Sequence, residues 1–245
     1  MAPEPVLEVA GISKRFPGVR ALDGVRLTVR RGTVHALMGE NGTSKSTLMR
    51  ILAGLDSADS GTIRFRGRAF APRHPQDALR MGISMIHQEL LPFPGMTVAE
   101  NIFMGREPTR GWPGWIDRGR MARDGAALLA RVGATFGPSR RMGELGVADM
   151  QLVEIAKALG HRAELLIMDE PTSALSAREV AALFALVSEL KAAGVAIIYI
   201  SHRLEEVFRI ADVVTVLRDG RFVGSGVIGS MDEARLISMM VGREL

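Results

Sequence analysis

The chain has 245 residues, of which 47% are hydrophobic, and its 31 basic and 27 acidic side chains give a net charge of +4. This is enough apolar sequence for one large α/β domain, or for a domain with an inserted subdomain. Because cysteine is absent, disulfides, thiolate metal sites and cysteine catalysis are excluded, which suits a cytoplasmic protein. No apolar run approaches the roughly 20 residues of a membrane-spanning helix, and we expect no secretory signal at the start of the chain.

The first 30 residues predict two antiparallel strands. Residues 6–9 and 25–29 alternate apolar and polar side chains, as half-buried antiparallel strands do. Residues 13–18 lie between them and are expected to form a turn that carries one aromatic side chain, Phe16.

Residues 34–55 predict a strand, a loop and a helix in direct succession. The strand is the largely apolar run 34–38, which is typical of a buried parallel strand. One apolar face of the helix is formed by Leu48, Ile51, Leu52 and Leu55. The loop between them consists of Gly39, Glu40, Asn41, Gly42, Thr43, Ser44, Lys45, Ser46 and Thr47.

This succession is typical of a phosphate-binding loop. Consecutive backbone N–H groups and the positive end of the helix attract an anionic polyphosphate. In such a loop Lys45 would contact the β- and γ-phosphates, and the Ser46 hydroxyl would bind Mg²⁺. The strict pattern G-x-x-x-x-G-K-[ST] requires glycine where this chain has Ser44, so an ordinary strand–turn–helix is the alternative for this segment taken alone.

The middle of the chain predicts an inserted, mainly helical subdomain. A strand at 62–65, a helix at 73–81 and a strand at 83–87 that ends beside Gln88 come first. Residues 89–116 then become rich in proline and glycine and contain both tryptophans. Helices are expected at 97–104, where Thr97 and Glu100 form a capping box, and at 118–132 and 149–160. We therefore expect a helical subdomain at 90–160 and a nucleotide-binding core, with its β subdomain, at 1–89 and 161–245.

Alternating strands and helices resume after residue 160. An apolar strand at 165–168 is followed by a helix that Ser176 caps together with Glu179. Another apolar strand occupies 195–200. The remaining elements are expected to be strands at 212–217 and 221–227, joined by a turn, and a final helix at 231–241.

Polar side chains follow three apolar strands at the point where each strand should end. Besides the loop after residue 38, they are Asp169 and Glu170 after residue 168, and His202 after residue 200. Ligands of open α/β sheets bind at the carboxyl ends of the strands. Asp169 is therefore expected to hold Mg²⁺, Glu170 to orient or deprotonate a water, and His202 to contact a γ-phosphate. The alternatives are solvated acids at a loop tip and a structural histidine.

Seven segments carry a family resemblance over essentially the whole chain. In chain order they are KRFPG, GENGTSKST, IHQEL, LGVADMQLVEIAKAL, LLIMDE, SALS and YISHRLEEVF. With these segments in that order, the chain resembles the ATP-hydrolysing domain of ABC transporters. More narrowly, it resembles the ATPase of bacterial monosaccharide importers of the ribose, xylose and galactose type. The resemblance implies an α/β P-loop NTPase fold with a mostly parallel sheet, an N-terminal antiparallel β subdomain and an inserted helical subdomain.

The resemblance also implies site residues and cofactors, ATP and Mg²⁺. Phe16 would stack on adenine, and Lys45, Gln88, Glu170 and His202 would be catalytic. Ser46, Gln88 and Asp169 would bind Mg²⁺. Two such domains would close head to tail on two ATP molecules, each held between one phosphate loop and the other domain's signature segment. That segment consists of Leu145, Gly146, Val147, Ala148 and Asp149.

The partners implied are transmembrane permease subunits, a second ABC domain and, indirectly, a periplasmic sugar-binding protein. The second domain would be a fused half or another copy of the chain, because this sequence ends where the first half of a fused pair would end. Association with the cytoplasmic face of the inner membrane would then be peripheral. Nucleic acid is not expected as a partner, because the arginines are scattered and not interleaved with aromatic side chains.

Two residues depart from the family pattern where phosphate is contacted. Ser44 replaces a glycine, and would cost about 1–3 kcal/mol if only glycine can adopt the backbone angles there. Gly146 replaces a serine that donates to the γ-phosphate, a loss of about 1.5–3 kcal/mol. The alternative function is therefore a weakly hydrolysing, regulatory nucleotide-binding module of the same fold.

Overall fold

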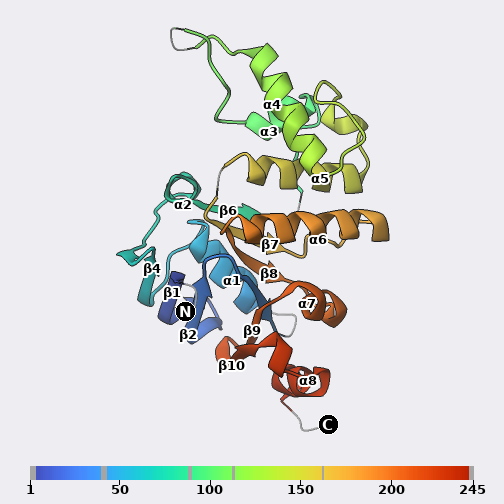
Figure 1. Ribbon diagram of the computed structural model, residues 1–245. Helices are drawn as coiled ribbons and strands as arrows, with labels where there is room; N and C mark the ends of the chain where they lie inside the picture. The colour runs from blue at the N-terminus through green and yellow to red at the C-terminus, as the bar shows by residue number, and fades with distance from the viewer. Residues whose placement is uncertain (1–3, 40–42, 88–89, 112–113, 162, 243–245) are drawn as a thin grey trace. The chain divides into compact units, whose positions relative to one another are not determined.

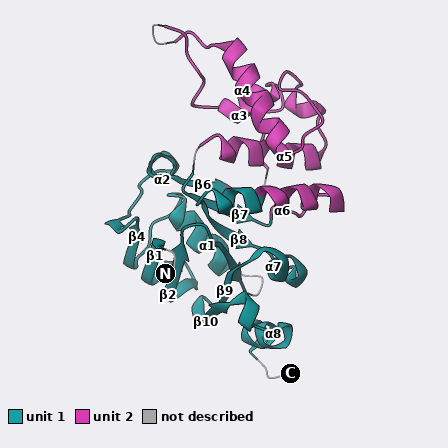
Figure 2. Ribbon diagram, in the orientation of Figure 1, with its two compact units in different colours: residues 1–85, 163–170, 187–245 teal, residues 86–162, 171–186 magenta. Residues whose placement is uncertain are grey.

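The computed structural model describes residues 4–39, 43–87, 90–111, 114–161 and 163–242 (Figure 1). The chain divides into two compact units (Figure 2). The first contains Met1–Met85, Ala163–Glu170 and Val187–Leu245, and the second contains Ile86–Arg162 and Pro171–Leu186. The sequence-based boundaries 1–89, 90–160 and 161–245 stay a prediction beside this division.

The first unit contains a four-stranded antiparallel sheet in the order β2-β1-β4-β5. Its strands are β1 (Pro5–Phe16), β2 (Val19–Arg30), β4 (Ser60–Phe65) and β5 (Arg68–Ala69). Antiparallel pairing of the first two strands is confirmed, with Leu7 opposite Val29. The prediction of a turn at 13–18 is wrong, because β1 continues through Phe16, which pairs with Val19. Only two residues are left for the turn, and the second is Gly18 with φ +76°.

A six-stranded sheet in the order β10-β9-β3-β8-β7-β6 forms the centre of the same unit. Strand β3 lies between β8 and β9 and is parallel to both, and β7 is parallel to β8. The prediction of a mostly parallel sheet is confirmed, with β10 as an antiparallel edge. The strands are β3 (Val34–Met38), β6 (Ile83–Ile86), β7 (Leu165–Asp169), β8 (Ala196–Ile200), β9 (Val213–Arg218) and β10 (Arg221–Val227).

The helices of the first unit follow the predicted positions with two differences. They are α1 (Thr43–Leu52), α2 (Pro75–Met81), α7 (Leu204–Ile210), α8 (Glu233–Val241) and a 3₁₀ turn at Ile228–Ser230. The sequence placed Leu55 on the buried face of α1, but the helix ends at Leu52 and Leu55 is 42% exposed. Gly54, with φ +73°, turns the chain away before Leu55. Helix α7 was not predicted.

Helices dominate the second unit. They are α3 (Val98–Phe103), α4 (Arg118–Arg131), α5 (Val147–Leu159), the first part of α6 (Ala177–Ala192) and a 3₁₀ turn at Met142–Glu144. Both predicted capping boxes are confirmed. Glu100 N donates to Thr97 Oγ1 over 3.2 Å while Thr97 N donates to Glu100 Oε2 over 2.8 Å. Ser176 and Glu179 make the same pair of bonds at the start of α6.

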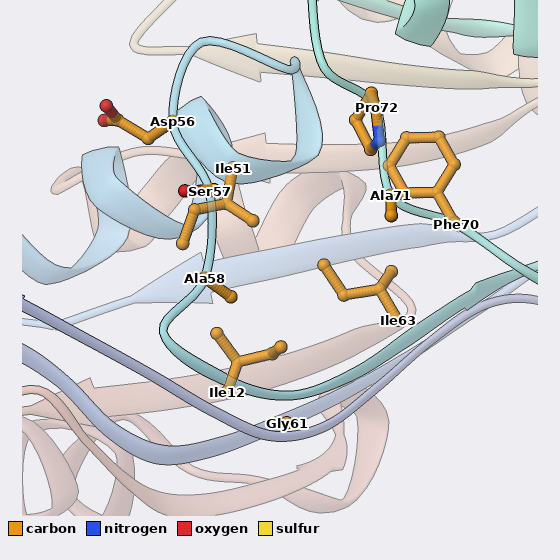
Figure 3. Close-up of a pocket in the computed structure, with 10 residues that line it drawn as sticks. All are labelled: Ile12, Ile51, Asp56, Ser57, Ala58, Gly61, Ile63, Phe70, Ala71 and Pro72. Atoms are coloured by element: carbon orange, nitrogen blue, oxygen red, sulfur yellow. The ribbon is translucent and has the colours of Figure 1, made fainter.

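A small apolar cavity lies in the first unit between α1 and the antiparallel sheet (Figure 3). Its volume is about 190 Å³. It is lined by Ile12, Ile51, Asp56, Ser57, Ala58, Gly61, Ile63, Phe70, Ala71 and Pro72. None of these belongs to the predicted phosphate site, so the cavity is a feature of the packing between α1 and the sheet. In the described ranges, no helix combines the length and the apolar character needed to cross a membrane.

Candidate functional site

The carboxyl ends of β3, β8 and β7 meet at one edge of the central sheet. Leu37, near the end of β3, pairs with Ile200 of β8, and Ile200 also pairs with Asp169 of β7. The segments that leave these strands carry the phosphate loop, Glu170 and His202. The parallel register therefore brings together three stretches that are more than 30 residues apart in sequence.

Gly39 occupies a position at the end of β3 that admits no side chain. A Cβ atom there would overlap the backbone carbonyl oxygen of Leu217 in β9. Because that neighbour is backbone, it cannot rotate away. The chain therefore passes close to the backbone of β9 at Gly39, where β3 has ended.

Lys45 lies in the first turn of α1 with its side chain directed back to the strand end. Its Nζ donates to the carbonyl oxygen of Gly39 over 2.8 Å. Burial lowers the pKa of the Lys45 ammonium, and the negative charges of Glu170 and Asp169 oppose that shift. The ammonium is thus within electrostatic reach of both acids that the sequence singled out.

The other loop residues divide by exposure. Thr43 and Ser46 are exposed, whereas Ser44 and Thr47 are buried. The strain considered for Ser44 is absent, since Ser44 lies within α1 and is not among the residues with positive φ. Its backbone is therefore one that any residue adopts. Glu40, Asn41, Gly42 and Gln88 lie outside the described residues.

Asp169 is the last residue of β7 and is largely buried. Burial raises the pKa of its carboxyl to about 6, the charge of Glu170 adds to the rise, and Lys45 opposes it. A buried carboxyl whose ionised form is disfavoured in this way gains from a bound cation, which would restore its charge. The donor set of Asp169 and the exposed Ser46 hydroxyl fits Mg²⁺, which takes few protein oxygens together with phosphate oxygens.

Glu170 leaves the sheet with a left-handed backbone, φ +47°. Its N–H donates to the carbonyl of Ile200 over 3.0 Å, so the end of β8 holds this conformation. A left-handed non-glycine residue costs about 1–3 kcal/mol, and residues strained in this way cluster at active sites. The unusual backbone directs the side chain of Glu170 towards the segment that follows β8.

His202 meets Glu170 at this edge. Its Nδ1 lies 3.1 Å from Oε1 of Glu170, and the side chain of His202 is 63% exposed while that of Glu170 is 18% exposed. An exposed imidazole joined to a largely covered carboxylate is able to meet a ligand from solvent. The sequence predicted both residues, but only the structure shows that they contact each other.

Phe16 lies at the end of β1, where the antiparallel sheet turns. Its ring is partly exposed and lies 5.6 Å from Nζ of Lys14. Aromatic rings stack face to face with an offset, and this ring is in part open to solvent. The geometry is thus compatible with the predicted contact to an adenine base.

The predicted signature segment lies in the second unit at the start of α5. Leu145 is buried, and Gly146 is the N-cap with φ −71° and ψ 165°. Val147 is exposed, and Ala148 and Asp149 fall in the first turn of α5. Apart from its two chain neighbours, no described atom lies within 4 Å of the position that a Cβ of Gly146 would occupy, so the described part of the fold does not require glycine there.

Solved structures define the class of fold. The chain matches a nucleotide-free ATP-binding cassette from an ABC transporter with a TM-score of 0.82 and 29% identity, covering 98% of this chain and 96% of that one. An ADP-bound cassette of an ABC transporter matches with a TM-score of 0.82 and 28% identity, covering 98% and 100% of the two chains. The fold is therefore that of an ABC cassette, a P-loop NTPase.

The family follows from the sequence comparisons. The ABC transporter family profile matches residues 22–173, so this chain belongs to the ABC transporter family. A relative from Rhizobium etli, named a putative ribose/galactose/methyl galactoside import ATP-binding protein, is 54% identical over 98% of this chain and 47% of its own length. A ribose import ATP-binding protein from Burkholderia cenocepacia is 51% identical over 100% and 48%. The chain thus spans about half the length of the curated relatives it matches.

Proposed function

We propose that this chain is the ATP-hydrolysing domain of an ABC importer that takes up a monosaccharide through a membrane permease. The observation that carries the proposal is the convergence of Lys45, Asp169, Glu170 and His202 at one sheet edge, in the fold of an ABC cassette. The names of the relatives, which are about 50% identical, supply the substrate class. No observation favours the regulatory alternative, and the ordinary backbone of Ser44 removes one of its two arguments.

Each residue of the site has a proposed task. Lys45 binds the phosphates, the amides from Gly39 to Thr47 surround them, and Phe16 stacks on adenine. Ser46, Asp169 and Gln88 would hold Mg²⁺, which supplies neutralisation of phosphate charge when it is bound.

Glu170 and His202 would then act on the water that attacks the γ-phosphate. Glu170 accepts a hydrogen bond from the water and orients it or takes its proton. His202 limits the rotation of that carboxylate through its 3.1 Å contact and presents its other ring nitrogen to the phosphate. Residues 145–149 would bind the nucleotide held by a second ABC domain.

The proposed partners follow from the proposal that the chain is part of an ABC importer. They are permease subunits, a second ABC domain that is either fused or another copy, and a periplasmic sugar-binding protein that acts indirectly. The chain would work as a peripheral subunit at the cytoplasmic face of the inner membrane. Gly146 is proposed to slow hydrolysis without abolishing it.

The test is steady-state ATP hydrolysis by the purified chain with Mg²⁺, compared with Glu170→Gln. We expect the substitution to lower kcat by about 100-fold or more, because it removes the carboxylate that acts on the water. Binding of a fluorescent ATP analogue should persist in the variant. Glu205→Gln, a substitution of an exposed glutamate in α7, is the control and should leave both properties unchanged. Hydrolysis that is unaffected by Glu170→Gln would contradict the proposal.

A further inference from the structure

A buried carboxylate lies directly behind His202. Glu206, in α7, is 4% exposed, although the neighbouring Glu205 is exposed to solvent. Its Oε2 accepts hydrogen bonds from the Tyr199 hydroxyl and the Ser201 hydroxyl, each over 2.9 Å. Its Oε1 lies 2.8 Å from Nη1 of Arg203. Three donors, one of them charged, therefore converge on one buried anion.

The donors include the residues on both sides of His202. Ser201 precedes the histidine and Arg203 follows it, and both bond to Glu206. Ser201 Oγ also accepts a hydrogen bond from the backbone N–H of Arg203 over 3.0 Å. The two neighbours of His202 are thus connected to each other by a hydrogen bond, and both contact the carboxylate of Glu206.

Tyr199, the fourth residue of the cluster, connects Glu206 to the central sheet. Tyr199 is fully buried on β8, where it pairs with Ala36 of β3 and Met168 of β7. Its hydroxyl reaches the same oxygen of Glu206 as Ser201 does. The carboxylate of Glu206 therefore links segment 201–203 to the central sheet.

A buried anion is expensive, and an apolar side chain would fill the same space at lower cost. Stability alone therefore gives weak grounds for a glutamate at this position. The side chain of His202, by contrast, is mostly exposed and has to keep its Nδ1 within reach of Glu170. Fixing the backbone on both sides of the histidine supplies the restraint that packing does not.

We propose that Glu206 is a positioning residue that holds segment 201–203 so that His202 engages Glu170. Glu206 touches neither nucleotide nor water in this scheme and acts only through His202. The inference rests on the proposed function, since it assigns a second layer of residues to the same hydrolytic site.

The decisive experiment is a double-substitution cycle on ATP hydrolysis by the full chain. Glu206→Gln keeps the shape of the side chain and removes the charge that pairs with Arg203. We expect kcat to fall about tenfold with KM for ATP changed less than twofold, because misplacing a catalytic group affects the chemical step. Glu205→Gln should change neither quantity.

Substitution of His202 separates positioning from a general structural effect. If Glu206 acts through the histidine, then Glu206→Gln should lower kcat no further in a His202→Ala background. Independent, multiplicative losses in the double variant would overturn the inference. A His202→Ala variant with undiminished hydrolysis would instead contradict the proposed function itself, so the two failures are distinguishable.

A second pair of variants protects the test if Glu206→Gln does not fold. Ser201→Ala and Tyr199→Phe each remove one hydroxyl donor to the same oxygen of Glu206. Both should lower Tm, but Ser201→Ala should lower kcat several-fold more, because only Ser201 belongs to the segment that carries His202. Equal losses of kcat in the two variants would show a purely structural cluster.

Discussion

Two charged side chains, the buried Glu206 in the first unit and the half-buried Arg106 in the second, are satisfied in different ways. Glu206 receives its bonds from the side chains of three residues within seven positions of it. Arg106 donates to backbone carbonyls: Nη1 to Gly160, and Nη2 to Ile102 and Lys157 over 3.0 Å each. Its Cζ lies 5.0 Å from the ring of Phe103.

Charge compensation also differs between the two. In the described part of the chain no carboxylate pairs with Arg106, and its Nε has no hydrogen-bond partner. Burial accordingly lowers the pKa of the Arg106 guanidinium. What it meets instead is the carboxyl end of α5, where the helix dipole favours a cation. The carboxyl end of α5 therefore stabilises the charge of Arg106, as the ion pair with Arg203 stabilises the charge of Glu206.

Removal of the Arg106 side chain should have the largest effect on the stability of the fold. Arg106→Ala should lower the free energy of unfolding by about 3 kcal/mol, because three partly buried carbonyls lose a charged donor together. Urea denaturation followed by circular dichroism measures this. Arg106→Lys, which keeps the charge but not the planar fork of donors, should recover only part of the loss. A loss below about 1 kcal/mol for the alanine variant would show that the carbonyls find water instead.

The next largest effect on stability is expected at Gly160, because the lack of a side chain there leaves room for the guanidinium of Arg106. A Cβ on Gly160 would lie 2.7 Å from Nη1 and 2.8 Å from Cζ of Arg106, and closer still to Nη2. Gly160→Ala should therefore displace the guanidinium and cost about 2 kcal/mol of unfolding free energy. In an Arg106→Ala background the same substitution should cost almost nothing. A loss that is unchanged by the background would mean that Gly160 is needed for another reason.

His35 sharpens the comparison, because it is a buried ionisable group that stays neutral. Its Nε2 lies 2.7 Å from Oγ1 of Thr215, and burial lowers the pKa of the imidazole to about 4, against 6.5 for the unshifted group. The unfolded chain therefore binds a proton below pH 6.5 that the folded chain refuses until about pH 4. Stability is thus fully present above pH 6.5 and falls as the pH drops towards 4.

Between pH 7 and pH 5 this group should remove about 1.5–2 kcal/mol of unfolding free energy. Urea titrations at the two pH values measure the difference. His35→Gln keeps a hydrogen-bonding partner for Thr215 and cannot titrate, so its pH dependence should be weaker by that amount. Identical slopes in the two proteins would refute the assignment.

The smallest stability effect lies at the other end of α5. Gly146 is the N-cap there and provides no side-chain bond, and there is room for a Cβ. Gly146→Ser should raise the unfolding free energy by a few tenths of a kcal/mol by capping the helix, in a calorimetric scan against the parent. If the proposed role of residues 145–149 is right, kcat for ATP should rise as well. Gly146→Ala, which offers a Cβ without a hydroxyl, is the matched control and should reproduce neither gain.

Local patterns were readable from the sequence where the interacting residues are neighbours. The capping boxes of Thr97 with Glu100 and of Ser176 with Glu179 form as predicted, because each joins residues three positions apart. The strand that ends at Asp169 was also readable, since a fully buried parallel strand is an apolar run. The predictions for 13–18 and Leu55 were wrong, because the pairing of β1 with β2 leaves only two residues for the turn and Gly54 ends the path of α1 before Leu55.

The candidate site shows the same division. The sequence alone singled out the candidate residues Lys45, Asp169, Glu170 and His202, because each follows an apolar strand in a recognisable order. The tertiary structure decided the contact of Glu170 with His202, the burial of Glu206 and the ordinary backbone of Ser44. The physical reason is distance along the chain. Side-chain contacts across 30 or more residues, and the burial that shifts pKa values, arise only when parallel strands bring their ends to one edge of a sheet.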